Sequence, residues 1–431
     1  MSAPAAVKSG LKSRLHGAPL LERLGPGIIT GAADDDPSGI ATYSQGGAQF
    51  GYGLLWTLLL TFPLMVAIQM VSALIGRVTG RGLASNMAGI LPRPVIGLLV
   101  ALLFVTNTVN VGADLAAMGE AAKLVTGFNQ HAFTILFALV SLTLQLFMPY
   151  RRYARFLMML TFSLYAYVAV LFLLKLDWAA IGAGLIGLHP HLSRDAATTI
   201  VAIFGTTISP YLFFWQSAQE VEEVGEHPDE QPLLRDPKEA PEAIGRIRID
   251  TIAGMFISNM IALSIMIATA ATLNPHGVTD IRTAAQAAEA LRPLAGPFAF
   301  GLFSLGIVGT GLLAIPVLAG SAAYAMGDAW GWKTGLNNMP WQATGFYAVI
   351  GSAMLLGLLI DWSPLDPIRA LYWTAVLNGL ISVPMMAALM IVASSRRRMG
   401  EFRAGRVLGG LGWLCTAIMA AAAITMIYVS L

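Results

Sequence analysis

About eleven long apolar segments constrain this chain more than any other feature of its sequence. A helix needs about 20 mostly apolar residues to cross a bilayer. The chain is 56% hydrophobic and only 12% charged, whereas soluble domains carry about 25% charged residues, which excludes an ordinary cytosolic protein, a disordered chain and a nucleic-acid binder. No segment alternates like a barrel strand, so the sequence predicts an all-α polytopic membrane protein. The expected spans are 20–48, 54–79, 92–125, 131–149, 153–176, 198–224, 247–272, 296–327, 341–361, 367–394 and 405–430.

The placement of Lys and Arg predicts how the chain is oriented. If the N-terminus is cytoplasmic and the spans alternate, all but six of the 26 basic residues lie inside, as the positive-inside rule requires. We therefore expect a multi-pass protein of the plasma (inner) membrane with its N-terminus in the cytoplasm and its C-terminus outside. The six outside residues are Lys123, Lys175, Arg194, Arg282, Arg292 and Arg369.

The first span cannot be a simple helix. It reads GPGIITGAADDDPSGIATYSQGGAQFG, with Asp34, Asp35 and Asp36 near the expected bilayer centre. One intramembrane carboxylate costs about 2.5–3.5 kcal/mol on insertion scales, so three will not face lipid. Pro37 removes a backbone donor and restricts Asp36, while Gly39 frees the backbone to turn. The sequence predicts an unwound segment that lines a polar cavity.

The sixth span has a matching defect, because Pro210 follows a cluster of hydroxyl residues in TTISPY. Spans 1 and 6 correspond if spans 1–5 and 6–10 form two halves, the second inverted. Paired broken helices of this kind indicate a transporter site near the midplane. Freed carbonyls and the Asp36 carboxylate favour a cation there, since no basic residue lies between Arg23 and Arg77.

These motifs resemble those of the Nramp metal-ion transporters. GPGIITGAADDDPSG is similar to the first helix of that family, with its Asp-Pro-Gly-Asn signature, and TTISPY falls where the family has Met-Pro-His. NVGADLAAMGEA resembles the family's third-helix Asp motif. The resemblance covers roughly residues 20–430.

The resemblance implies a LeuT-like inverted repeat of five plus five helices with broken helices 1 and 6, followed by an eleventh helix. The expected organisation is a cytoplasmic tail (1–19), a first five-helix repeat (20–176), a second, inverted repeat (177–394), and a basic cytoplasmic loop with the eleventh helix (395–431). The resemblance also implies a transporter rather than an enzyme, and we expect a monomer.

Departures from the family pattern bear on the substrate. The resemblance assigns the family's metal-binding Asp to Asp36, its Asn to Gly39, its Met to Ser209, its carbonyl-donating alanine to Thr206 and its histidine to Tyr211, while an acidic residue of the third helix becomes Ala117. The thioether, which favours softer metals, is therefore lost, whereas oxygen ligands suit Mg²⁺, Ca²⁺ and Mn²⁺. The expected metal site comprises Asp36, Gly39, Thr206, Ser209, Ala33 and Tyr211.

The pattern is most similar to the Nramp-related magnesium transporters. We expect Mg²⁺, and also Mn²⁺, to enter as a partly hydrated substrate in a widened site, with no cofactor. None of the six histidines falls in a span centre, so we expect uptake without proton coupling. Two alternatives stay open, a proton-coupled Mn²⁺/Fe²⁺ importer and a LeuT-fold carrier of an organic solute. The roles of Asp34, Asp35, Asp114 and Asn378 stay open too, as does simple back-bonding by the hydroxyls of span 6. The acidic run 220–230 is read as a solvated face.

Overall fold

All regular structure in the described residues is helical. The computed structural model describes residues 25–148, 150–187, 193–226, 230–362 and 366–430, so the expected tail 1–19 lies outside it. Eight helical stretches there are long and apolar enough to cross a membrane, and two shorter apolar helices accompany them, at Phe156–Leu171 and Thr344–Ile360. One such helical stretch can contain more than one predicted span. Pro37–Thr79, for example, contains the second half of the first span and the whole of the second span.

Each of the eleven predicted segments coincides with one helix or with a pair of shorter ones. The principal helices are α2 (Pro26–Asp34), α3 (Pro37–Phe50), α4 (Leu55–Thr79), α5 (Leu83–Met87), α6 (Arg93–Thr126), α7 (Gln130–Phe147), α8 (Tyr150–Thr161), α9 (Tyr165–Leu171), α10 (Trp178–Ile186), α11 (Arg194–Thr207), α12 (Pro210–Glu226), α13 (Ala240–Thr272), α14 (Ala284–Ala288), α15 (Arg292–Ala295), α16 (Ala299–Trp330), α17 (Thr344–Ile360), α18 (Pro367–Ser394), α19 (Arg396–Met399) and α20 (Arg406–Ser430).

The two predicted breaks are present. The first span is divided into α2 and α3 at Asp35–Asp36, and the sixth into α11 and α12 at Ile208–Ser209. Other prolines leave their helices continuous: Pro63 in α4, Pro316 in α16 and Pro384 in α18. The breaks therefore occur where proline follows a run of polar residues that offer the backbone other hydrogen-bond partners.

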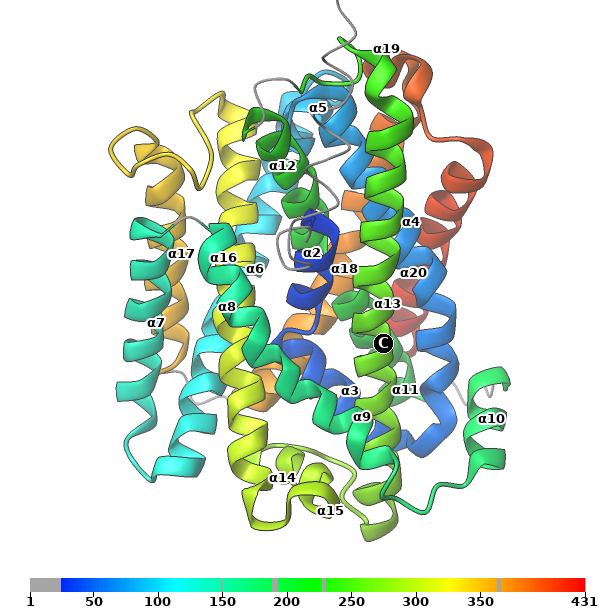
Figure 1. The fold of residues 1–431 in the computed structure, drawn as a ribbon. Coiled ribbons are helices and arrows are strands. Elements are labelled where there is room, and N and C mark those ends of the chain that lie inside the picture. The colour runs from blue at the N-terminus through cyan, green and yellow to red at the C-terminus, as the bar shows by residue number, and fades with distance from the viewer. Residues whose placement is uncertain (1–24, 149, 188–192, 227–229, 363–365, 431) are drawn as a thin grey trace, which may run out of the picture.

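Contacts between helices of the two halves come in equivalent pairs. The broken helix α2–α3 packs on α13, the seventh span, and α12 of the other broken helix packs on α4, the second span. Likewise α6, the third span, packs on α18, the tenth span, and α16, the eighth span, packs on α8 in the fifth span. These reciprocal contacts fit the LeuT-like inverted repeat. Figure 1 shows α2 and α3, in dark blue, in the middle of the bundle, surrounded by the continuous helices.

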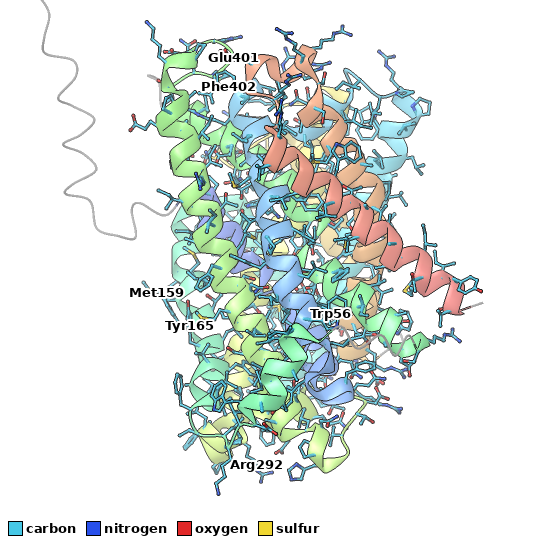
Figure 2. The ribbon with its side chains drawn as sticks, turned by 90° about the vertical axis from the view of Figure 1, so that its right-hand side faces the viewer. Trp56, Met159, Tyr165, Arg292, Glu401 and Phe402 are labelled. Carbon is cyan, nitrogen blue, oxygen red and sulfur yellow. The ribbon has the colours of Figure 1, made fainter. Side chains whose placement is uncertain are left out.

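The structure also contains helices that the sequence did not predict. The fifth span is irregular as well, because the 3₁₀ turn Phe162–Leu164 separates α8 from α9. Short helices α14 and α15 cover one end of the bundle, and α5 and α19 lie at the opposite end (Figure 1). We refer to these as the α14 end and the α19 end. Arg292 marks the α14 end and Glu401 and Phe402 the α19 end in Figure 2, where α20 leans away from the bundle.

Tryptophans are exposed near both ends of the bundle. Trp330 and Trp332 lie at the end of α16, which reaches the α19 end, while Trp178 in α10 and Trp362 after α17 lie towards the α14 end. Tryptophan prefers the boundary between the hydrocarbon core and water. The bundle thus carries an aromatic boundary at each end, as a protein that crosses the bilayer requires.

Glycines allow the tightest helix contact near the second break. A Cβ atom on Gly205 of α11 would overlap the Ala375 carbonyl and the backbone of Gly379 in α18. We therefore expect Gly205→Ala to destabilise the folded protein by about 1–3 kcal/mol through overpacking, measured as a lower melting temperature in detergent. The matched control is Gly97→Ala in α6, where nothing lies within 4 Å of the added atom and stability should be unchanged or slightly raised. Equal melting temperatures for the two variants would contradict this packing.

Candidate metal site

Asp36 lies at the first break and caps the helix that follows it. Its backbone is extended, and its Oδ1 accepts hydrogen bonds from the Gly39 amide at 2.8 Å and from the Ser38 hydroxyl at 2.6 Å. This is an N-cap, which satisfies a free amide at the positive end of α3. The same aspartate that the sequence assigns to ion binding therefore also fixes where α3 begins.

The second carboxylate oxygen of Asp36 faces other helices. Its Oδ2 accepts from the Tyr211 hydroxyl at 3.1 Å and from Asn110 Nδ2 at 3.5 Å. The Tyr211 hydroxyl also lies 3.4 Å from the carbonyl oxygen of Ala33. The structure thus brings together three of the predicted site residues, Asp36, Ala33 and Tyr211, and adds Asn110, which the sequence analysis did not single out.

All partners of Asp36 are neutral. None of the ion pairs in the described residues involves Asp34, Asp35, Asp36 or Asp114. Asp36 is only 1% exposed, and a buried carboxylate without a cationic partner is strongly disfavoured. In the described part of the chain, no three His, Cys, Asp or Glu side chains are placed to hold a metal together. The arrangement offers a cation one carboxylate with carbonyl, amide and hydroxyl oxygens around it.

Asp34 and Asp35 turn towards α13 instead. Both are buried, and both contact one hydroxyl, that of Ser258, with Oγ 2.6 Å from Asp34 Oδ2 and 3.0 Å from Asp35 Oδ1. A hydroxyl has a single hydrogen to donate, so it cannot satisfy both carboxylates at once. Asp34 Oδ1 has no hydrogen-bond partner among the described residues. This pair therefore places two further carboxyl groups beside Asp36 and ties the end of α2 to α13.

At the second break, the hydroxyls of Ser209 and Thr207 bond to their own helix, whereas the Tyr211 hydroxyl contacts Asp36. The Ser209 hydroxyl donates to the carbonyls of Gly205 (2.7 Å) and Thr206 (2.9 Å), so it satisfies the end of α11 and makes no hydrogen bond to Asp36. The Thr207 hydroxyl likewise bonds to carbonyls of its own helix. Back-bonding, left open from the sequence, is what the structure shows for both residues.

Thr206 lies across from Gly39. A Cβ atom on Gly39 would lie 3.2 Å from Thr206 Oγ1 and 3.3 Å from the Tyr43 ring, so these side chains fill the space beside the glycine. The widened site expected from the loss of Asn and Met is therefore not open at this position in the structure. Gly39 contributes its amide to Asp36, and Thr206 contributes a nearby hydroxyl oxygen.

Two further polar residues are buried without partners. Neither carboxylate oxygen of Asp114 in α6 has a hydrogen-bond partner among the described residues, and the same holds for both amide atoms of Asn378 in α18. Asp114 follows Asn110 by one helical turn, so the two share the face of α6 that meets Asp36. Two buried polar residues on successive turns of α6 therefore lie near the break.

The residues that hold α2 in place were missed from the sequence. Asp250 of α13 accepts hydrogen bonds from the Gly27 amide at 2.6 Å and the Ile28 amide at 3.2 Å, which caps α2 from another helix. The Thr30 hydroxyl lies 2.5 Å from Gln216 Oε1 of α12. No local pattern identifies such partners, because they lie more than 180 residues away along the chain.

The acidic run 220–230, expected to be a solvated face or loop, is buried at its start and exposed at Gly225 and Glu226. Glu220 lies in α12, which continues to Glu226, and it is fully buried and pairs with Arg246 of α13 at 2.6 Å. Glu222 accepts a hydrogen bond from Tyr324 at 2.5 Å. Residues 227–229 lie outside the described residues. These contacts tie α12 to α13 and α16 near the α19 end.

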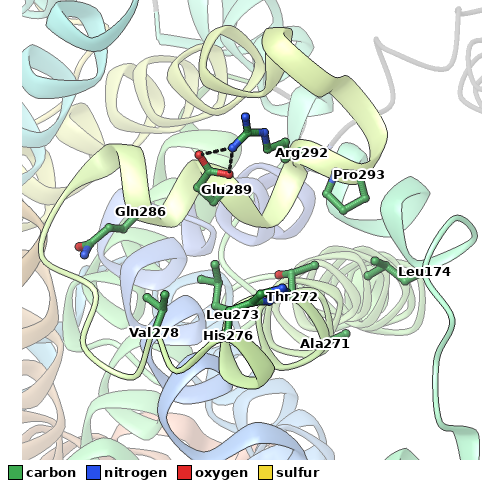
Figure 3. Close-up of a pocket in the computed structure, with 10 residues that line it drawn as sticks. All are labelled: Leu174, Ala271, Thr272, Leu273, His276, Val278, Gln286, Glu289, Arg292 and Pro293. Carbon is green, nitrogen blue, oxygen red and sulfur yellow. Dashed lines mark hydrogen bonds and ion pairs between the residues drawn. The ribbon is translucent and has the colours of Figure 1, made fainter.

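A pocket of about 650 Å³ lies away from the breaks, near the α14 end. Figure 3 shows its lining from the end of α13, the loop after it, α14 and α15, with Glu289 and Arg292 paired at one side. No residue of α2, α3, α11 or α12 lines it. It is therefore separate from the polar groups around Asp36.

Comparison with known proteins identifies the family of this chain. The family model described as "Natural resistance-associated macrophage protein-like" matches residues 27–429. The divalent metal cation transporter MntH of Deinococcus radiodurans is 26% identical over 415 residues, which cover 93% of this chain and 88% of that protein.

Solved structures share the fold. The Eremococcus coleocola manganese transporter superposes with a TM-score of 0.75 at 17% identity, covering 98% of this chain and 88% of that one. Mhp1, a nucleobase-cation-symport-1 family transporter, gives 0.51 at 13% identity over 94% and 93%. These relatives are named as transporters, not enzymes. Because the family model spans almost the entire sequence, this chain belongs to the Natural resistance-associated macrophage protein-like, or Nramp, family.

Proposed function

We propose that this protein carries divalent cations across the plasma membrane by alternating access, with Mg²⁺ as its main substrate and Mn²⁺ as a second. The observation that carries this proposal is the buried carboxylate of Asp36, held between two broken helices by neutral donors alone. A cation supplies the charge that this carboxylate lacks. The proposed site is lined by Asp36, Ala33, Tyr211 and Thr206, with Gly39 and Ser209 at its margin.

The chemistry of these groups favours a hard cation. Carboxylate, carbonyl and hydroxyl oxygens suit Mg²⁺ and Mn²⁺, whereas a thioether would select softer metals. Ser209 stands where the family resemblance places methionine, and its hydroxyl bonds to the backbone. Mg²⁺ gives up water reluctantly and is commonly held by one or two carboxylates while it keeps several waters. A site with one carboxylate therefore supports transport of a partly hydrated ion.

The relatives support the second substrate, and the basic residues support inward transport. The names of the D. radiodurans and E. coleocola proteins specify divalent metal cations and manganese. We propose that the N-terminus and the α19 end are cytoplasmic and the C-terminus external, as the basic residues predict. Moving one charge inward then gains about 2.3 kcal/mol per 100 mV of membrane potential, and a dication gains about twice that. Such a gradient suffices for uptake without proton coupling.

Asp114 favours the main alternative, a proton-coupled importer of Mn²⁺ or Fe²⁺. Its carboxylate is buried and has no hydrogen-bond partner in the described part of the chain, and intramembrane carboxylates serve as proton relays in transporters. An organic solute with a carboxylate would need a cationic partner, and no described basic side chain forms an ion pair with the aspartates at the break.

Asp36→Asn tests the site without removing the helix cap. Asparagine retains an acceptor for the Gly39 amide, so α3 should stay capped while the charge is lost. We expect Mg²⁺ and Mn²⁺ flux into proteoliposomes to fall at least tenfold, because one carboxylate carries the site's charge. The control is Asp280→Asn, which removes an exposed carboxylate paired with Arg282 and should leave flux unchanged. Flux that survives in Asp36→Asn would remove this residue from the mechanism.

Proton coupling is tested by recording internal pH during the same uptake. With a pH-sensitive dye inside the vesicles, we expect Mg²⁺ or Mn²⁺ entry to leave internal pH unchanged at a fixed membrane potential. Acidification that follows metal entry in the wild type and disappears in Asp114→Asn would instead establish the proton-coupled alternative.

Ser209→Met tests the basis of selectivity. A thioether at the second break should raise uptake of Mn²⁺ and Cd²⁺ relative to Mg²⁺ by about tenfold, because sulfur prefers softer ions. Combining Ser209→Met with Gly39→Asn, which restores the asparagine of the family signature, should increase this shift in ion preference. Ser352→Met in α17 is the matched control, since the Ser352 hydroxyl also bonds to the carbonyl three residues before it but lies outside the broken helices. An unchanged ion preference in Ser209→Met would place residue 209 away from the ion.

A further inference from the structure

The Tyr211 hydroxyl lies between the two oxygens that the proposed site offers to an ion. It is 3.1 Å from Asp36 Oδ2 and 3.4 Å from the carbonyl oxygen of Ala33. Carboxylates and carbonyls only accept hydrogen bonds, so the hydroxyl must be the donor in both contacts, with its hydrogen directed towards the pair of acceptors.

A cation and this hydrogen compete for the same lone pairs. A Mg²⁺ ion binds oxygen at about 2.0–2.1 Å, and an ion at that distance from Asp36 Oδ2 would meet the partial positive charge of the hydroxyl hydrogen. Binding therefore requires the hydrogen to turn away from Asp36. The other oxygen of Asp36 is already engaged by the Ser38 hydroxyl and the Gly39 amide, so it offers the ion no easier approach.

The same hydroxyl joins the two broken helices. Tyr211 stands in the first turn of α12, whereas Ala33 and Asp36 flank the break between α2 and α3. Another contact between α12 and α2 joins Gln216 to the Thr30 hydroxyl, and both of these residues are buried. Turning the Tyr211 hydroxyl away therefore removes one polar contact between the two broken helices and leaves that between Thr30 and Gln216.

We propose that Tyr211 is a placeholder for the cation: its hydroxyl occupies the ion's position at Asp36 and Ala33 in the empty site, and ion binding displaces it. Resting on the proposed function, this inference assigns Tyr211 a role beyond lining the site, as the residue that ties α12 to the first break until an ion arrives. Ion binding then loosens α2 from α12, and affinity is set partly by the hydrogen bonds that the ion must replace.

The test measures Mn²⁺ and Mg²⁺ binding to the purified full-length protein by calorimetry, together with melting temperatures with and without ion. In Tyr211→Phe the ion meets no competing hydrogen. We expect Mn²⁺ to bind roughly tenfold more tightly, since hydrogen bonds to charged groups are among the stronger ones. The ion-free melting temperature should fall, and the increase on adding Mn²⁺ should be larger than in the wild type.

Tyr372→Phe is the matched control. It removes the hydroxyl of a partly buried tyrosine that contacts Thr199 at 2.8 Å, away from Asp36, so the ion-free melting temperature should fall while Mn²⁺ affinity stays unchanged. Tyr211→Leu, which also lacks the hydroxyl, replaces Tyr211→Phe if that variant does not fold. Weaker or unchanged Mn²⁺ binding in the hydroxyl-less variant would overturn the inference, because Tyr211 would then be a ligand or a bystander.

Asp36→Asn separates this inference from the proposed function. If that variant loses Mn²⁺ binding while Tyr211→Phe binds as the wild type does, the cation site stands and the placeholder role fails. If Asp36→Asn still binds Mn²⁺ with wild-type affinity, both fail, because the ion then binds elsewhere.

Discussion

The structure depends on how negative charge is accommodated where the first span breaks. Asp34, Asp35 and Asp36 are buried together, and their partners are hydroxyl, amide and carboxamide groups without a positive charge. Such groups weaken the penalty of burying a carboxylate but do not neutralise it. Under the proposed function a cation supplies the charge that balances them, and the surrounding helices keep lipid away from the carboxyl groups.

Asp36 links the start of α3 to the burial of these carboxyl groups. Asp36 ends the unwound segment by capping α3 with Oδ1 and leaves Oδ2 for contacts from α6 and α12. The helix start thus fixes the position of the carboxylate, and the packing of α6 and α12 fixes what surrounds it. Because α2 is capped from α13 by Asp250 and tied to α12 by Thr30, both half-helices are held by distant parts of the chain.

The positions of the spans and of both breaks could be predicted from the sequence, because they follow from local composition. Apolar length predicts a span, and a run of polar residues before proline predicts a break, whereas Pro63, Pro316 and Pro384 lack such runs and leave their helices continuous. Partners of the site were not predictable in this way. Asn110 and Ser258 are ordinary polar residues in apolar spans, and only the packing of α6 and α13 brings them to the aspartates. The burial of Glu220 depends similarly on Arg246 in another helix.

The two breaks have unequal roles, although their positions in the two halves correspond. At the second break, Ser209 and Thr207 return their hydroxyl hydrogens to carbonyls of α11, so this half-helix end is largely satisfied by its own residues. At the first break, the carboxylates rely on side chains from other helices, and Tyr211 reaches across from α12 to both Asp36 and Ala33. A ligand that binds at the first break must therefore change contacts between helices, whereas at the second it would disturb mainly one helix. This asymmetry makes the first break the place where binding energy can be converted into helix movement.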